Sequence, residues 1–231
     1  MIEDSEIPTI DHIATSIDQD AVREKRFALL ALAIFILSEG VSTLKFILTR
    51  GLPYNQIAYL SALQALIFWW ILPILIVYKV EHKDWRSLGL AVQREKRLIY
   101  LLYAVIGLIL PALFLGIDRT LLIEFGEQVI YIGFIEEIFY RGYLLRRMCD
   151  WLGDTSGLLI TSILFGLGHI FSRLAQKGFA VLGPASLIGL QSFLGGLLLG
   201  SIYLRARNIW PSTIFHVSLN MYLNRIIELF S

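Results

Sequence analysis

Residues 133–144 have the sequence Gly133-Phe-Ile-Glu136-Glu137-Ile-Phe-Tyr-Arg141-Gly-Tyr-Leu144. Two carboxylates and a guanidinium interrupt an otherwise apolar run, which predicts a helix buried in a membrane protein. An ionisable side chain at membrane depth costs about 2.5–3.5 kcal/mol, so each one needs a partner or a function. Glu137 and Arg141 are four residues apart and share a helix face, which predicts an ion pair. Glu136 points about 100° away from that face, so it lacks a partner on its own helix and is a candidate general base.

The composition of the chain is that of a polytopic membrane protein. Of its 231 residues, 56% are hydrophobic, and the mean hydropathy is +0.67. A soluble domain is typically about 45–50% apolar, and several apolar runs here are about 20 residues long, enough to cross a bilayer. The net charge of +1 gives no electrostatic case for nucleic acid as a partner. The single cysteine, Cys149, excludes an intrachain disulfide.

The apolar runs predict an all-α transmembrane helical bundle of about seven spans. We expect a polar cytoplasmic N-terminal tail at 1–26 and a single transmembrane domain at 27–231, with a catalytic core at about 127–224. A re-entrant or interfacial piece between 98 and 145 is the alternative, and it would raise the count to eight. The expected spans are 27–48, 57–80, 98–117, 127–145, 156–171, 184–204 and 209–230.

Three features within these spans carry further predictions. The first span contains Glu39 and Lys45, so one of its sides should face the bundle. Pro73 predicts a kink in the second span, because proline cannot donate a backbone hydrogen bond. Gly196 and Gly200 predict close helix packing within the bundle rather than a dimer site.

Lysine and arginine predict the orientation. Most of them fall in the tail and in the loops that follow the second, fourth and sixth spans. Positive residues favour the cytoplasmic side, so the N-terminus is expected in the cytoplasm and, with seven spans, the C-terminus outside. We expect an integral membrane protein of the plasma membrane in a prokaryote, or of the endoplasmic reticulum in a eukaryote.

Two further pairs of residues recur in the late spans with helical spacing. His169 follows Phe165 by four residues, and Asn220 follows His216 by four residues. With Glu136 they supply a carboxylate to take a proton from water, an imidazole to hold that water, and two donors for an oxyanion. This set suits amide hydrolysis. One difficulty is depth, since His169 comes late in its span from one side and His216 early in its span from the other.

These residues resemble the motifs of the CPBP family, which comprises the CAAX proteases and bacteriocin-processing enzymes and is also called the Abi family. The family's Glu-Glu-xxx-Arg motif is matched by Glu136, Glu137 and Arg141. Its Phe-xxx-His and His-xxx-Asn motifs are matched, in order, by Phe165 with His169 and by His216 with Asn220. The resemblance covers about 127–224, and the first three spans are similar only in being hydrophobic.

The resemblance implies an intramembrane glutamate protease like the Ras-converting CAAX endopeptidase. Glu136 and His169 would then activate water, and His216 and Asn220 would form the oxyanion hole. Glu137, Arg141 and Phe165 would support the site. No metal or other cofactor is expected. The implied partners are membrane lipid and a protein or peptide substrate, either a prenylated protein that loses its C-terminal tripeptide or a peptide precursor; the oligomeric state is not predicted.

Four alternatives remain at this point. Two histidines and two glutamates could bind zinc, although the His-Glu-xx-His pattern is absent. Cys149 could act as a nucleophile, but its place beside Arg146 and Arg147 suggests an ordinary thiol. The same fold could also serve as a non-catalytic scaffold or as a bacteriocin-immunity protein. A transporter with a proton relay is disfavoured because no inverted repeat is visible.

Overall fold

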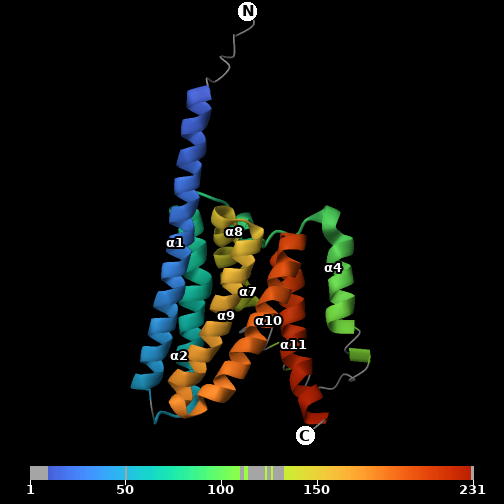
Figure 1. The fold of residues 1–231 in the computed structure, drawn as a ribbon. Helices are drawn as coiled ribbons and strands as arrows, with labels where there is room; N and C mark the ends of the chain where they lie inside the picture. The colour runs from blue at the N-terminus through green and yellow to red at the C-terminus, as the bar shows by residue number, and fades with distance from the viewer. Residues whose placement is uncertain are drawn as a thin grey trace, which may run out of the picture.

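The computed structural model describes residues 10–49, 51–109 and 133–229, together with residues 112, 113, 123 and 126. Within these residues the chain is helical and has no strand, which confirms the predicted all-α bundle (Figure 1). Four described helices are long and apolar enough to cross a membrane, namely Asp18–Leu48, Asn55–Lys79, Asp154–Lys177 and Phe179–Ala206. They match the first, second, fifth and sixth predicted spans. The total of seven stays a prediction.

The helices follow one another with short connections. The first half contains α1 (Ile10–Leu48), α2 (Tyr54–Ala65), η1 (Leu66–Ile71), α3 (Leu72–Lys79), η2 (Trp85–Leu88), η3 (Arg94–Lys96), α4 (Arg97–Ala104) and η4 (Val105–Ile109). The second half contains α7 (Phe134–Glu137), η6 (Ile138–Leu145), α8 (Arg146–Leu152), α9 (Asp154–Lys177), η7 (Phe179–Val181), α10 (Leu182–Ala206) and α11 (Ile209–Leu229).

Some predictions fall outside the described residues. These are the first nine residues of the expected tail, the end of the third span, the start of the fourth span, and most of the region in which an extra piece was considered. The helix α1 begins at Ile10, so it includes much of the segment expected to be a tail. The expected seventh span corresponds to α11.

The bundle is built around α9, which runs antiparallel to α10 and also contacts α1 and α8, while α11 lies between α10 and α4 (Figure 1). Glycines allow the close approach of α9 and α10. A Cβ on Gly196 would lie 3.0 Å from the Ser162 Cα, and one on Gly200 would overlap the Leu158 side chain. Both glycines therefore pack within the bundle, as the sequence predicted.

Of the three π-helical stretches in the described residues, two interrupt the second and fourth spans. Pro73 follows η1, and the N–H of Leu72 donates to the carbonyl of Ile67, five residues back. The sequence predicted a kink at Pro73, and the structure shows a π-helical widening of the turn directly before it. The second stretch, η6, carries Arg141 and directly follows the two glutamates. π-Helical turns occur often at functional sites because they shift side chains out of the regular α-helical register.

The segment between α3 and α4 holds the ends of two later helices together. Its carbonyls at Gly89 and Leu90 accept hydrogen bonds from the Ile209 N–H at 3.0 Å and the Trp210 Nε1 at 3.0 Å. Glu81 is buried and pairs with Arg147 of α8, with 2.5 Å between the Glu81 Oε2 and the Arg147 Nη2. These contacts fix the start of α11 relative to η6 and α8, and so set the depth at which His216 meets the glutamates.

Candidate active site

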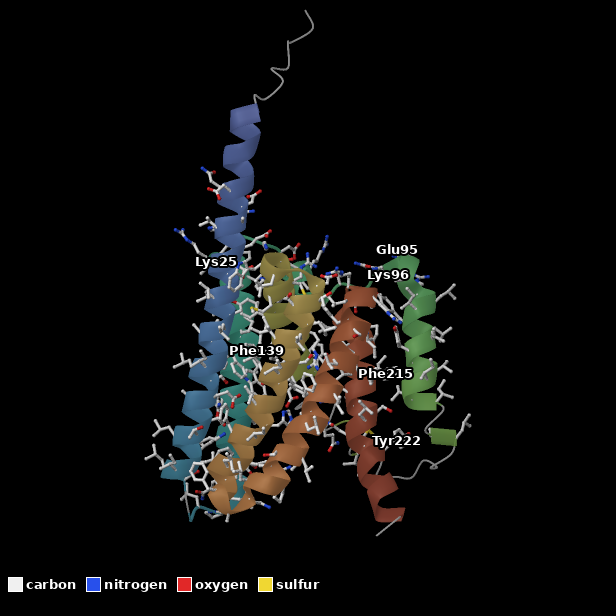
Figure 2. The ribbon with its side chains drawn as sticks, viewed as in Figure 1. Lys25, Glu95, Lys96, Phe139, Phe215 and Tyr222 are labelled. Carbon is white, nitrogen blue, oxygen red and sulfur yellow. The ribbon has the colours of Figure 1, made fainter. Side chains whose placement is uncertain are left out.

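Three parts of the bundle carry the sequence-predicted polar residues. The segment α7–η6 supplies Glu136, Glu137 and Arg141; α9 supplies Phe165 and His169; α11 supplies His216 and Asn220. Aromatic side chains surround them. Phe139, labelled in the middle of the bundle in Figure 2, stacks on Trp69 with 6.1 Å between ring centroids. This apolar surround limits the access of water to the polar groups.

Glu137 and Arg141 form the predicted ion pair. The Arg141 Nη1 lies 2.9 Å from the Glu137 Oε1, and the two side chains are 3% and 0% exposed. The Arg141 guanidinium also lies over the Phe165 ring, 4.6 Å from its centroid. A buried guanidinium between a carboxylate and an aromatic face is stabilised by both. This pair ties η6 to α9.

His216 lies between the two glutamates. Its Nδ1 is 3.0 Å from the Glu137 Oε1, and its Nε2 is 3.6 Å from the Glu136 Oε2. The expectation that Glu136 stands without a partner therefore holds only along its own helix, because α11 brings an imidazole beside it. A carboxylate can only accept here, so the Nδ1 of His216 donates to Glu137, and its Nε2 faces Glu136.

His169 is oriented by its own helix. Its Nδ1 lies 2.9 Å from the Phe165 carbonyl oxygen, which accepts the hydrogen bond and leaves the Nε2 of a neutral ring as an acceptor. The Phe165 ring meets both imidazoles edge-on, at 4.7 Å to His169 and 6.0 Å to His216 between ring centroids. The two histidines thus contact one aromatic ring. The different depths in the membrane that their places in the sequence suggested therefore do not keep them apart. Asn220 lies one turn after His216 on α11 and is half-buried.

Two neighbours of the site were not assigned a role from the sequence. A Cβ built on Gly168 would lie 3.3 Å from the Glu39 Oε1 and 3.1 Å from the Tyr140 hydroxyl oxygen. Glu39 of α1 and Tyr140 of η6 therefore meet α9 at the residue that precedes His169. The available sequence signal for Glu39 was a charge within an apolar span. Tyr140 carried no such signal because tyrosine is common in buried helices.

Other reactive groups lie apart from this cluster. Burial, together with the charge of Asp154, raises the pKa of the Cys149 thiol to about 12, so this cysteine lacks the thiolate character of a nucleophile. No group of three or more His, Cys, Asp or Glu side chains among the described residues is arranged to hold a metal ion.

Comparison with known proteins identifies the part of the chain that holds the three motifs. Residues 118–222 match the family model described as type II CAAX prenyl endopeptidase Rce1-like. No curated protein and no solved structure matched the chain. The matched stretch contains every predicted catalytic residue, and the apolar helices around it make the protein an integral membrane protein. Over residues 118–222, the chain is therefore similar to the Rce1-like family of type II CAAX prenyl endopeptidases, which agrees with the resemblance that the motifs predicted.

Proposed function

We propose that the protein is an intramembrane endopeptidase that hydrolyses a peptide bond with water activated by Glu136 and His169. The substrate class is a C-terminal CAAX-type tripeptide on a prenylated protein, or a peptide precursor. The observation that carries the proposal is the position of His216 between the two glutamates, 3.0 Å from Glu137 and 3.6 Å from Glu136. It joins two of the three family motifs in one polar cluster.

Glu136 and His169 suit the activation of water. The Glu136 Oε2 is buried and accepts no hydrogen bond from the described residues, so it is available to a water molecule. The Nε2 of a neutral His169 is also an acceptor, since its Nδ1 is used by the Phe165 carbonyl. As the water oxygen attacks the carbonyl carbon, its proton passes to Glu136. That proton then moves to the amine nitrogen as the C–N bond breaks.

His216 and Asn220 suit the stabilisation of the oxyanion. A protonated His216 has two N–H donors, one for Glu137 and one on the side of Glu136, where the substrate carbonyl would lie. Asn220 follows one turn later on α11, and its amide can donate a second hydrogen bond to the same oxygen. Glu137 and Arg141 act by holding His216 in place.

The test is single-turnover cleavage of a fluorogenic prenylated CAAX peptide by purified protein. Glu136→Gln keeps the size of the side chain but cannot take the proton, so this variant should bind the peptide and fail to cleave it. Glu95→Gln, at an exposed position near the start of α4 (Figure 2), is the matched control and should cleave like wild type. Thermal melts verify that both variants fold.

Three outcomes would overturn the proposal. Cleavage by Glu136→Gln at a rate near that of wild type excludes glutamate as the base. Stoichiometric zinc in active, chelator-washed protein, in an amount that rises and falls with activity, would indicate a metal mechanism instead of the glutamate mechanism. A wild-type protein that cleaves no peptide, with a cellular phenotype that survives Glu136→Gln, would support a scaffold.

A further inference from the structure

The buried carboxylate of Glu137 receives both of its charged partners on one oxygen. The Arg141 Nη1 lies 2.9 Å from the Glu137 Oε1, and the His216 Nδ1 lies 3.0 Å from the same atom. The Glu137 Oε2 is also buried, and in this arrangement it accepts no hydrogen bond from the described residues. A buried carboxylate oxygen without a donor is costly, so a further donor for Glu137 is expected close by.

Ser212 is in place to be that donor. It is completely buried on α11, one turn before His216, and its side chain lies within hydrogen-bonding reach of the Glu137 carboxyl. In the structure the Ser212 hydroxyl donates to the Ile209 carbonyl at 2.9 Å. Because a hydroxyl hydrogen rotates about the C–O bond, the same oxygen atom can donate to the carboxylate instead.

The Ile209 carbonyl keeps a partner when the Ser212 hydroxyl turns away from it. The Thr213 hydroxyl donates to this carbonyl as well, also at 2.9 Å. The two neighbouring hydroxyls therefore duplicate one bond within α11, whereas of the two only Ser212 reaches Glu137. The start of α11 stays in place during this exchange, since the Ile209 N–H donates to the Gly89 carbonyl at 3.0 Å.

A further donor determines how the Glu137 carboxylate is turned. With donors on Oε1 alone, the carboxylate can rotate and offer either oxygen to Arg141 or to His216. A hydrogen bond from Ser212 holds the carboxylate so that Oε1 stays on the His216 Nδ1, and that contact fixes the tautomer and the ring plane of the imidazole. The direction of the His216 Nε2, which lies 3.6 Å from the Glu136 Oε2, follows from it.

We propose that Ser212 is a positioning residue for His216 that acts through Glu137. Its hydroxyl donates to the Glu137 carboxylate and keeps the neutral imidazole in the tautomer with the proton on Nδ1. This proposal rests on the proposed function, in which His216 assists hydrolysis, and adds to it the group that fixes the ring. Ser212 lies within the matched stretch 118–222 but outside the three motifs.

The first measurement is single-turnover cleavage of the fluorogenic prenylated CAAX peptide by Ser212→Ala, with Thr213→Val as the matched control. Both changes remove a buried hydroxyl that bonds the Ile209 carbonyl. Ser212→Ala should slow cleavage on the order of tenfold, as expected for the loss of a group that orients a functional histidine, and should leave the Kd of the peptide unchanged. Thr213→Val should cleave like wild type. Thermal melts verify that both variants fold.

The second measurement reads the histidine directly and needs no activity. In protein with isotope-labelled histidine, the nitrogen chemical shifts show which ring nitrogen carries the proton. His216→Gln identifies the signals of residue 216 among those of the four histidines. Wild type and Thr213→Val should show a neutral His216 that is protonated at Nδ1, and Ser212→Ala should show a mixture of the two tautomers.

The two measurements separate this proposal from the proposed function. A Ser212→Ala protein that keeps His216 protonated at Nδ1, like wild type, overturns the role of Ser212 whatever its rate of cleavage. Equal slowing by Ser212→Ala and Thr213→Val also overturns it, because the loss then belongs to the packing of α11. If wild type cleaves no peptide, the proposed function fails, and the tautomer of His216 in Ser212→Ala still decides the role of Ser212.

Discussion

At the scale of single residues, the site depends on how buried charges are paired. Arg141 is almost completely buried and balances Glu137, while five residues later Arg146 forms a pair with Asp150 of the same i, i+4 spacing at 3.1 Å. The Arg146 side chain is 37% exposed. Both pairs join residues four apart, although the acid comes first in one and second in the other, and they differ strongly in burial, so their comparison reports mainly the effect of burial.

We therefore predict that Arg141→Ala lowers the free energy of unfolding by about 3–5 kcal/mol, because it leaves an unpaired carboxylate in the core. Arg146→Ala should cost no more than about 1 kcal/mol, because water screens the exposed pair. Thermal and chemical unfolding in detergent measure both. Equal losses for the two variants would show that burial of the Glu137–Arg141 pair contributes nothing to stability.

Asn220 is predicted to act on the rate and not on the fold. Asn220→Ala removes one oxyanion donor and keeps the base, so single-turnover cleavage should slow by about 10²–10³-fold. Asn55→Ala, at an exposed position just inside the start of α2, is the matched control. A variant at 220 that melts at the wild-type temperature and cleaves at the wild-type rate would remove Asn220 from the mechanism.

At the scale of elements, the π-helical segment η6 is packed so tightly that a methyl group does not fit. A Cβ on Gly142 would lie 2.5 Å from the Leu88 carbonyl oxygen of η2, whereas one on Gly195 of α10 would have no atom within 4 Å. Gly142 therefore allows the segment between α3 and α4 to lie directly on the helix that carries Arg141. Both glycines are helical, Gly142 in the π-helix η6 and Gly195 in the α-helix α10, and only Gly142 has another segment against it.

Gly142→Ala should lower the free energy of unfolding by about 1–3 kcal/mol, since the backbone of η2 must move to admit the methyl group. Gly195→Ala should leave it unchanged or raise it by about 0.5–1 kcal/mol, since alanine favours the helix. Unfolding curves of the two variants measure the difference. The close contact between η6 and η2 has no energetic role if Gly142→Ala is as stable as Gly195→Ala.

At the scale of the whole molecule, charged residues far apart in the sequence lie at the same end of the bundle (Figure 2). Lys25 of α1 lies at the same end as Glu95 and Lys96 of η3 (Figure 2). The helix α9 runs from this end to the opposite one (Figure 1). By the positive-inside rule, we predict that the end with Lys25 faces the cytoplasm. Lys177, the last residue of α9, is exposed at the other end.

The topology is testable with single cysteines placed at exposed positions. Lys25→Cys and Glu95→Cys should react with a membrane-impermeant maleimide from the cytoplasmic side, and Lys177→Cys from the other side. The native Cys149 gives little background, because burial raises the pKa of its thiol to about 12 and the reactive thiolate is scarce near neutral pH. Labelling of Lys25→Cys and Glu95→Cys from different sides would contradict the arrangement of α1 and α4. Labelling of both from the outside would reverse the predicted orientation.

The sequence by itself determined the class of the protein and the residue types of its site. Apolar runs of about 20 residues must become helices in a bilayer, since the backbone has no water to bond with. The i, i+4 spacing placed Glu137 with Arg141, Phe165 with His169, and His216 with Asn220, because helical neighbours follow from the chain alone. The motifs also predicted the region of the family match, about 127–224 against the observed 118–222.

Only the tertiary structure decided which of these helix faces meet. The approach of His216 to both glutamates depends on the depth of α11, which the segment between α3 and α4 sets through its hydrogen bonds to Ile209 and Trp210. The π-helical register of η6 and the place of Glu39 against Gly168 likewise depend on contacts between segments far apart in the chain. Local spacing carries no information on such contacts, because they are selected by how whole helices pack.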